Sequence, residues 1–322
     1  MNLSAESGPS QAASSAYLVV EAELPNPDSN INYARAHLFL GYAFLMMAEH
    51  FCVGTVRSGP ELSTAAMLDS AIAQFNLAVT RGSGAGGTDG NALANAARVG
   101  IARAELQAGR PAQAIAAAQS VPAGFVFNLN FQDDLAQRGR LANKMWQFVR
   151  DRGSIAVAPA WRINDPRVPR QEPTTFAPQD AAYELDRGIP YAIQLKYPDY
   201  NAPVRLASKL EADYIQAEAE GTASQLALIQ ARRAANTQPA YAGAVDANSV
   251  LTEFLTQKGL DFYLEGKRLG DFRRRVCAHQ LACRARRPRP GRGDVPRRLP
   301  LARPAAQGRF QLGFSRTRDL AS

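Results

Sequence analysis

The stretch that decides the fold is Glu253–Arg275, which reads EFLTQKGLDFYLEGKRLGDFRRR. Leu255, Phe262 and Leu269 recur at intervals of seven residues. Phe272 extends this apolar stripe at helical spacing. Charged residues fill the other positions at spacings of three and four, so that acids lie beside bases on one face of a helix. The stretch therefore predicts one long, tightly specified helix.

The polar side of this predicted helix favours an architectural role. Glu265 lies three residues before Arg268, and Lys267 lies four residues before Asp271, so two ion pairs can form along one side. Gly266 leaves room for another helix or loop to cross closely. We therefore expect these residues to brace the scaffold and not to bind a ligand.

After this stretch the composition changes to Arg, Pro, Ala and Gly. Residues 276–322 contain 11 Arg, no Lys, 2 Asp and no Glu, a net charge of +9 in a chain whose total is +8. The rest of the chain is close to neutral, which argues against nucleic-acid binding by the main body. The tail is either an Arg-rich arm for nucleic acid or anionic lipid, or the product of a shifted reading frame in GC-rich DNA. We favour the shifted frame and expect this tail to be disordered or non-native.

Length and cysteine content set further bounds. The 322 residues suffice for a sizeable core, and the 46% hydrophobic content is ordinary. The chain has three cysteines, Cys52, Cys277 and Cys283. Because they are few and odd in number, they exclude a disulfide scaffold. Cys277, His279 and Cys283 lack a fourth zinc ligand and a normal spacing, so no metal is expected. No apolar run reaches the length of a membrane span.

The first 121 residues predict paired helices. Apolar patterns cover 32–52, 64–80, 91–108 and 111–121, and Ser63 is a plausible N-cap for the second of them. The last two segments are rich in Ala and Gly, which lets helix backbones approach closely as in tetratricopeptide-type solenoids. The sequence therefore predicts a mainly α fold with tetratricopeptide-like helical pairs at 30–121.

The pattern changes in the middle of the chain. Residues 122–204 contain FVFNLNF, SIAVAPAWRI and PYAIQLKY, which predict short strands among loops rich in Pro, Asp and Arg. Helical patterns return at 205–220, 224–236 and 249–275. We expect one domain over 1–275, in which an irregular insertion at 122–204 interrupts the helical pairs and C-terminal helices occupy 205–275.

Taken in order, three segments resemble the SusD/RagB family. ARAHLFLGYAFLMMAEHFCV (34–53) is similar to the family's first long buried helix. KLEADYIQAEAE (209–220), followed by LALIQARRAAN (226–236), resembles its acidic helix and the basic partner of that helix. FLTQKGLDFYLEGKRLGDFRR (254–274) resembles its C-terminal signature, in which an acidic-Gly-basic step precedes Asp and more Arg. The resemblance covers roughly residues 30–275.

The resemblance implies a role in nutrient capture. Proteins of this family are surface lipoproteins of the outer membrane that bind glycans or other nutrients, pass them to a SusC-like TonB-dependent transporter and perform no bond chemistry. The resemblance thus implies a non-enzyme without a cofactor. The alternative left open by the residues is an α-solenoid adaptor that binds a protein or peptide partner.

A glycan site needs exposed aromatic faces for sugar C–H surfaces, with polar groups for the hydroxyls. The insertion supplies such side chains, although the same rings could fill the core instead. The candidate ligand-binding residues are Trp146, Trp161, Arg162, Asp165, Tyr183, Tyr191, Tyr197 and Tyr200.

Other signals are interpreted as structural. Residues 82–87 fit G-x-G-x-x-G, but they follow a helix predicted to end near Thr80, so we expect a flexible loop and not a dinucleotide site. No basic or metal partner is evident for the acids Glu211, Glu218 and Glu220, which favours a solvated helix face. No nucleophile elbow or paired catalytic carboxylates occur.

The N-terminus also departs from the family pattern. The family begins with a lipoprotein signal and an acylated Cys, and neither is visible at the start of this chain. We therefore expect Met1 to be an internal start or the sequence to be a fragment.

Overall fold

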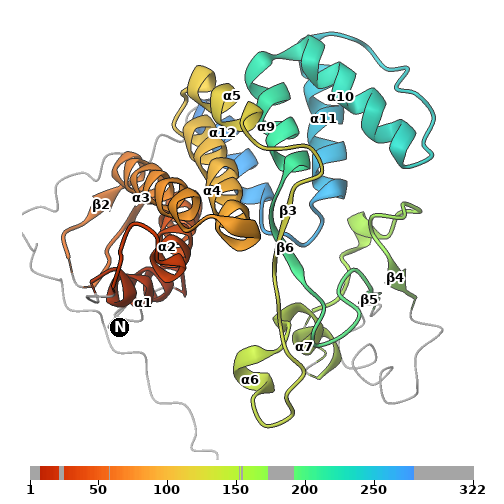
Figure 1. Cartoon of the computed structure of the whole chain (residues 1–322). Helices are drawn as coiled ribbons and strands as arrows, with labels where there is room; N and C mark the ends of the chain where they lie inside the picture. Colours follow the sequence, from red (N-terminus) through yellow and green to blue (C-terminus); the bar gives the residue numbers. More distant parts are fainter. Residues whose placement is uncertain are drawn as a thin grey trace, which may run out of the picture. The chain divides into compact units, whose positions relative to one another are not determined.

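Helices make up most of the structure, a computed structural model that describes residues 8–21, 25–57, 59–151, 153, 155–172 and 192–278. All of these residues belong to one unit, Met1–Leu281. The N-terminal helices are α1 (Gly8–Glu21), α2 (Ile31–His50), α3 (Thr64–Ala85), α4 (Gly87–Gln107) and α5 (Pro111–Gln119). Each packs against the next along the chain (Figure 1). The mainly α fold with paired helices that the sequence predicts is confirmed.

Local side-chain chemistry sets the ends of these helices. The side-chain oxygen of Asn30 accepts a hydrogen bond from a backbone N–H in the first turn of α2 at 3.0 Å. Ser63 accepts one from Ala66 at 3.2 Å, as predicted, and a short hairpin of β1 (Val53–Gly54) and β2 (Leu62–Ser63) precedes it. Both caps satisfy N–H groups that have no partner within the helix.

The core of α2, α3 and α4 packs small residues around one ring. Phe75 of α3 is fully buried and lies against Gly41 of α2 and Gly100 of α4. A Cβ at residue 41 would come within 2.6 Å of this ring, and a Cβ at residue 100 would also overlap it. Tyr42 meets the ring edge-on at a centroid distance of 4.9 Å. The backbones can approach this closely only because glycine stands at both positions.

Residues 82–87, which fit G-x-G-x-x-G, do not form a flexible loop, so that expectation is wrong. α3 continues past Thr80 to Ala85, and α4 begins at Gly87. Gly86 and Gly87 have φ of +65° and +62°, the left-handed region that favours glycine. Gly82 faces Gly90 so closely that a Cβ at residue 82 would lie 2.7 Å from the Gly90 carbonyl oxygen. The glycines therefore make a tight turn between two touching helices.

The insertion begins and ends at two paired strands. β3 (Val126–Leu129) lies antiparallel to β6 (Val204–Ser208), with a register shift between Phe127 and Asn128. The FVFNLNF prediction of a strand is thus confirmed. The elements between them are α6 (Arg138–Leu141), α7 (Lys144–Arg150), the 3-10 helix η1 (Pro159–Trp161), β4 (Arg170–Gln171) and β5 (Ile193–Gln194), the last two paired antiparallel.

One expected strand is missing from the described residues. In the segment SIAVAPAWRI, residues 155–158 are irregular and 159–161 form η1. The Val157 N–H still donates to the Ala192 carbonyl at 2.8 Å. Prolines inside a run favour this outcome, because Pro159 cannot donate a ladder hydrogen bond.

The C-terminal stretch forms two helices and not one. The helices of this half are α9 (Lys209–Glu220), α10 (Thr222–Ala235), α11 (Ala247–Asp261) and α12 (Arg268–Ala278). Between α11 and α12 the chain turns, with φ of +58° at Leu264 and +69° at Gly266. This break changes the helical phase, so Leu269 and Phe272 are 44% and 49% exposed instead of continuing the apolar stripe. The prediction of a single helix is therefore wrong.

Candidate functional site

The turn between α11 and α12 is the point where the insertion and the helices meet, and Asp261 at its start is buried. Arg232 of α10 donates to its two oxygens at 2.8 and 2.9 Å. Arg167 of the insertion donates at 3.1 Å, and the Tyr214 hydroxyl of α9 donates at 2.6 Å. Burial raises the pKa of Asp261, but the hydrogen bonds from Arg232 and Tyr214 outweigh it and lower the pKa. One carboxylate thus joins three separate parts of the chain.

Glu265, within the turn, joins the insertion in the same way. Lys196 Nζ donates to Glu265 at 2.7 Å, and Arg205 of β6 donates to both of its oxygens at 2.8 and 3.1 Å. Lys196 also donates to the Tyr263 carbonyl at 2.6 Å. The predicted ion pair between Glu265 and Arg268 is wrong, because the turn directs Glu265 towards these other cations.

Lys267, at the end of the turn, is also buried. Its ammonium donates to the Glu211 carboxylate of α9 and to the Leu206 carbonyl, the latter at 3.1 Å. Arg103 of α4 donates to Glu49 of α2 at 2.6 and 2.8 Å and contacts Glu211 at 3.4 Å. Burial lowers the pKa of Lys267, and Glu211 opposes this shift. These contacts tie α12 to α2, α4 and α9.

Asp271 pairs with a lysine other than the predicted Lys267. Lys258 of α11 donates to Asp271 at 2.7 Å and to Glu218 of α9 at 3.1 Å. Arg274 donates to the same two acids. Burial raises the pKa of Glu218, but the charges of Lys258 and Arg274 outweigh it and lower the pKa to about 2.

The expectation of a solvated acidic face on α9 is wrong for two of its three acids. The side chains of Glu211 and Glu218 are 3% and 8% exposed and each contacts at least two cations, whereas Glu220 is exposed. The partners come from α4, α11 and α12, far away in the sequence. The three helices therefore supply the cations that local spacing does not show.

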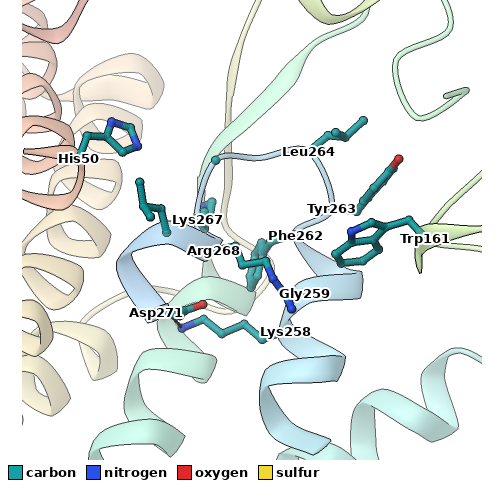
Figure 2. Close-up of a pocket in the computed structure, with 12 residues that line it drawn as sticks. His50, Trp161, Lys258, Gly259, Phe262, Tyr263, Leu264, Lys267, Arg268 and Asp271 are labelled. Carbon is teal, nitrogen blue, oxygen red and sulfur yellow. Dashed lines mark hydrogen bonds and ion pairs between the residues drawn. The ribbon is translucent and has the colours of Figure 1, made fainter. Parts of the chain in front are cut away.

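A pocket of about 280 Å³ lies beside this turn (Figure 2). Trp161 of η1 and Tyr263 of the turn form an aromatic pair at one side, with ring centroids 5.1 Å apart and planes tilted by 39°. The remaining lining residues are His50, Lys258, Gly259, Phe262, Leu264, Gly266, Lys267, Arg268, Leu269 and Asp271. We call this the Trp161 pocket. Its aromatic lining consists of the half-buried Trp161 and the buried Phe262 and Tyr263, and Arg268 adds an exposed cation.

Arg268 is the exposed cation of the Trp161 pocket. Its guanidinium carbon lies 5.3 Å from the centre of a Trp161 ring and 4.9 Å from that of Phe272. Figure 2 shows the side chain extending from α12 towards Gly259 of α11, with Trp161 beyond it. A Cβ at residue 259 would overlap the guanidinium and would lie 3.3 Å from the Trp161 ring. Glycine at 259 therefore makes the space in which the cation and the indole meet.

The other predicted ligand residues lie outside the Trp161 pocket. Trp146 of α7 meets Tyr200 edge-on at a centroid distance of 6.5 Å. Tyr200 donates to Asp151, and Arg138 lies over its ring at 4.0 Å. Neither Trp146 nor Tyr200 lines the Trp161 pocket.

Three further candidates lie in the insertion but do not line the Trp161 pocket. Asp165 is buried and accepts bidentate hydrogen bonds from Arg167 at 2.8 and 2.9 Å. Tyr197 is buried at a second pocket of about 440 Å³ that also includes Arg205. Arg162 donates to the Val157 carbonyl at 3.0 Å.

Tyr183 and Tyr191 lie outside the described residues. The structure thus places Trp161 in the Trp161 pocket beside the signature at 254–274, and it places Tyr197 in the second pocket, which Asp261 and Glu265 of the same signature also line.

Sequence reasoning missed several lining residues of the Trp161 pocket. Gly259, Phe262 and Tyr263 lie within the stretch that the sequence predicts to be one continuous helix. Arg268 was interpreted as structural. The sequence signal that could have found them is Gly266, since a glycine in a strong helical pattern can mark a turn.

Two kinds of site do not occur in the described part of the chain. No group of three or more His, Cys, Asp or Glu side chains is placed to hold a metal ion there. None of the helices in those ranges combines the length and the apolar content that a membrane crossing requires.

Comparison with known proteins gives similarity to solved structures alone. No protein-family model matches the chain, and a search of the curated proteins finds no match. A SusD superfamily protein from Bacteroides vulgatus is 14% identical, with 76% of this chain and 67% of that chain covered and a TM-score of 0.49. A laminarin binding SusD-like protein is 15% identical, with 84% and 76% covered and a TM-score of 0.49. A SusD homolog from Bacteroides fragilis is 14% identical, with the same coverage and a TM-score of 0.48.

Proposed function

We propose that this chain is a binding protein for a glycan or a similar polyhydroxylated nutrient, and that the Trp161 pocket is its site. The observation that carries the proposal is the tilted pair of Trp161 and Tyr263 at the edge of that pocket. Tyr263 is buried and supports the partly exposed Trp161 ring, whose face can pack against the C–H surface of a sugar ring while nearby polar groups bind hydroxyls. The sequence signature at 254–274, which resembles the SusD/RagB family, supports the same role.

The size and chemistry of the Trp161 pocket fit this role. Its volume of about 280 Å³ is at the small end of ligand pockets, which suits one sugar or the end of a longer chain. Ion pairs hold the polar lining residues Lys258, Lys267 and Asp271 in place. The polar groups of the pocket are therefore ordered before a ligand binds. Binding would then need little rearrangement of the helices.

The proposed physiological role is delivery without chemistry. The protein would hold the nutrient at the cell surface by equilibrium binding and pass it to a SusC-like TonB-dependent transporter in the outer membrane. Protease accessibility on intact cells, together with co-isolation of the chain and a barrel encoded by a neighbouring gene, tests this role. Protection from external protease and the absence of such a barrel would contradict it.

The binding itself is tested with a glycan array followed by calorimetry on the best binders. We expect Trp161→Ala to weaken binding at least roughly tenfold, because a stacked aromatic ring is lost. Trp146→Ala tests the other predicted aromatic cluster, and we expect a smaller effect because Trp146 does not line the Trp161 pocket.

The control is Phe39→Ala, which removes an exposed ring from α2 outside the Trp161 pocket. Near-ultraviolet circular dichroism and thermal melting establish that each variant is folded. Unchanged affinity in a folded Trp161→Ala variant would remove this pocket from the proposal. No glycan bound by the unmodified chain would contradict the proposed function as a whole.

A further inference from the structure

Arg268 differs from the other cations around the Trp161 pocket in its partners. Lys258 pairs with Asp271 at 2.7 Å, and Lys267 pairs with Glu211. Within the described ranges, the contacts of the Arg268 guanidinium are with the rings of Trp161 and Phe272, and no carboxylate forms an ion pair with it. The Trp161 pocket therefore has one exposed guanidinium that is not neutralised by a neighbouring acid.

The position of this guanidinium is set by the backbone around it. Gly259 provides the space for it, since any Cβ at that residue would overlap the guanidinium. Arg268 is the first residue of α12, so its backbone is fixed by the same turn that carries Tyr263. The guanidinium therefore lies against Trp161 and Phe272 without an opposite charge to hold it there.

The ring contact is easily exchanged for a stronger one. A cation–π contact at an exposed site is weak, whereas a guanidinium and a carboxylate form two charge-assisted hydrogen bonds in a matching planar geometry. A ligand carboxylate can therefore draw Arg268 away from Trp161. The indole face that it leaves becomes available to the sugar ring that bears the carboxylate.

We infer that the Trp161 pocket binds acidic sugars, with Arg268 pairing with the carboxylate of a uronic acid and Trp161 stacking on its ring. This inference rests on the proposed function, because it names the class of glycan that the same pocket takes. It assigns Arg268 a direct role in ligand selection, whereas the sequence signature alone gives this residue a bracing role. No bond is formed or broken.

The test uses uronic-acid oligosaccharides, such as oligogalacturonates and oligomannuronates, beside the same oligosaccharides with their carboxyl groups reduced to alcohols. Calorimetry on the full chain compares the two forms. We expect at least one acidic form to bind roughly 10- to 100-fold more tightly than its reduced form, with the difference shrinking as salt is added. Arg268→Gln should abolish this preference, so that the acidic and the reduced forms bind with similar affinity.

Arg138→Gln is the matched control. Arg138 also lies over an aromatic ring, that of Tyr200, but it is paired with Asp133 at 2.7 Å and lies outside the Trp161 pocket. This variant should keep the full preference for the acidic form. Arg268→Lys should keep part of it, since lysine retains the charge without the planar fork.

The outcomes separate the two proposals. Equal binding of acidic and reduced forms by the unmodified chain would overturn the inference about acidic sugars and leave glycan binding standing. A preference for the acidic form that survives in a folded Arg268→Gln variant would also overturn it. Binding of neither form, together with no hit among neutral glycans, would overturn the proposed function itself.

Discussion

Around Phe75 the helices α2, α3 and α4 meet mainly through apolar and small residues, with one buried ion pair, Arg103–Glu49, between α4 and α2. The helices α9 to α12 instead meet through a network of buried carboxylates and cations. In the first region the Phe75 ring lies against two glycines and meets Tyr42 edge-on. In the second region Asp261, Glu265 and Glu211 each contact cations from two or more elements. Adding volume destabilises a closely packed core, whereas removing one charge destabilises a buried charge network.

The largest loss of unfolding free energy should appear when one carboxylate of the charged region is neutralised. Asp261→Asn leaves Arg167 and Arg232 without their shared anion, and breaking a buried pair in this way costs about 3–5 kcal/mol of unfolding free energy. Urea unfolding measures the loss. Asp69→Asn is the control, because Asp69 pairs with Arg110 at the surface, where such a pair contributes about 0–1 kcal/mol. Equal losses in the two variants would contradict a special role for the buried network.

Acid should weaken the charged region selectively. Glu218 has a pKa near 2 in the folded chain, below the ordinary value of 4.5, so its ion pairs stabilise the fold above about pH 4.5. That stability is lost as the pH falls from about 4.5 towards 2, where Glu218 takes up a proton. Urea midpoints measured from pH 7 to pH 2 should therefore fall less steeply for Glu218→Gln than for the unmodified chain. Parallel curves would show that Glu218 does not contribute.

The packed region should respond to volume instead. Gly100→Ala forces a methyl group against the Phe75 ring and should cost about 1–3 kcal/mol. Gly139→Ala, where an added Cβ meets open space, should change the unfolding free energy by less than about 0.5 kcal/mol. Chemical denaturation of both variants at neutral pH makes the comparison. If Gly100→Ala were neutral, the helices of this region would be less tightly packed than the structure shows.

The smallest effect is expected at the turn between α11 and α12, which carries Glu265 of the charge network. Gly266 has φ of +69° and an added Cβ there meets nothing within 4 Å, so glycine is needed for its conformation and not for space. Gly266→Ala should therefore cost about 1–2 kcal/mol, and Gly266→Asn should cost less because asparagine tolerates this conformation. Thermal melting ranks the three chains. An asparagine variant less stable than the alanine variant would restore the steric explanation predicted from the sequence.

The packed region was largely predictable because its signals are local. Apolar periodicity located α2, α3 and α4, and Ser63 marked the start of α3. The small residues that crowd 91–108 are consistent with the close approach seen at Gly100. Each of these features depends on neighbours within a few residues, so periodicity and capping rules apply directly.

The charged region was not predictable because its partners are distant. Local spacing pairs Glu265 with Arg268, yet the structure pairs it with Lys196 and Arg205, which lie 69 and 60 residues away in the sequence. The turn at Gly266 decides this outcome, because it directs the charged side chains out of one helical face and into several neighbouring elements. Trp161 could be named as an aromatic candidate, but its meeting with Arg268 depends on the same turn.

The pairing of β3 with β6 has a consequence for how this protein can vary. Leu129 lies opposite Val204, so the chain leaves the helices and returns to them at adjacent points. Closing a longer loop costs only slightly more entropy than closing a shorter one, so the excursion between these residues can grow or shrink cheaply. Ion pairs of Arg167 with Asp261 and of Lys196 with Glu265 attach this excursion to the C-terminal helices and their turn. Selection can therefore change the residues of this excursion, Trp161 among them, while the helices keep their own packing constraints.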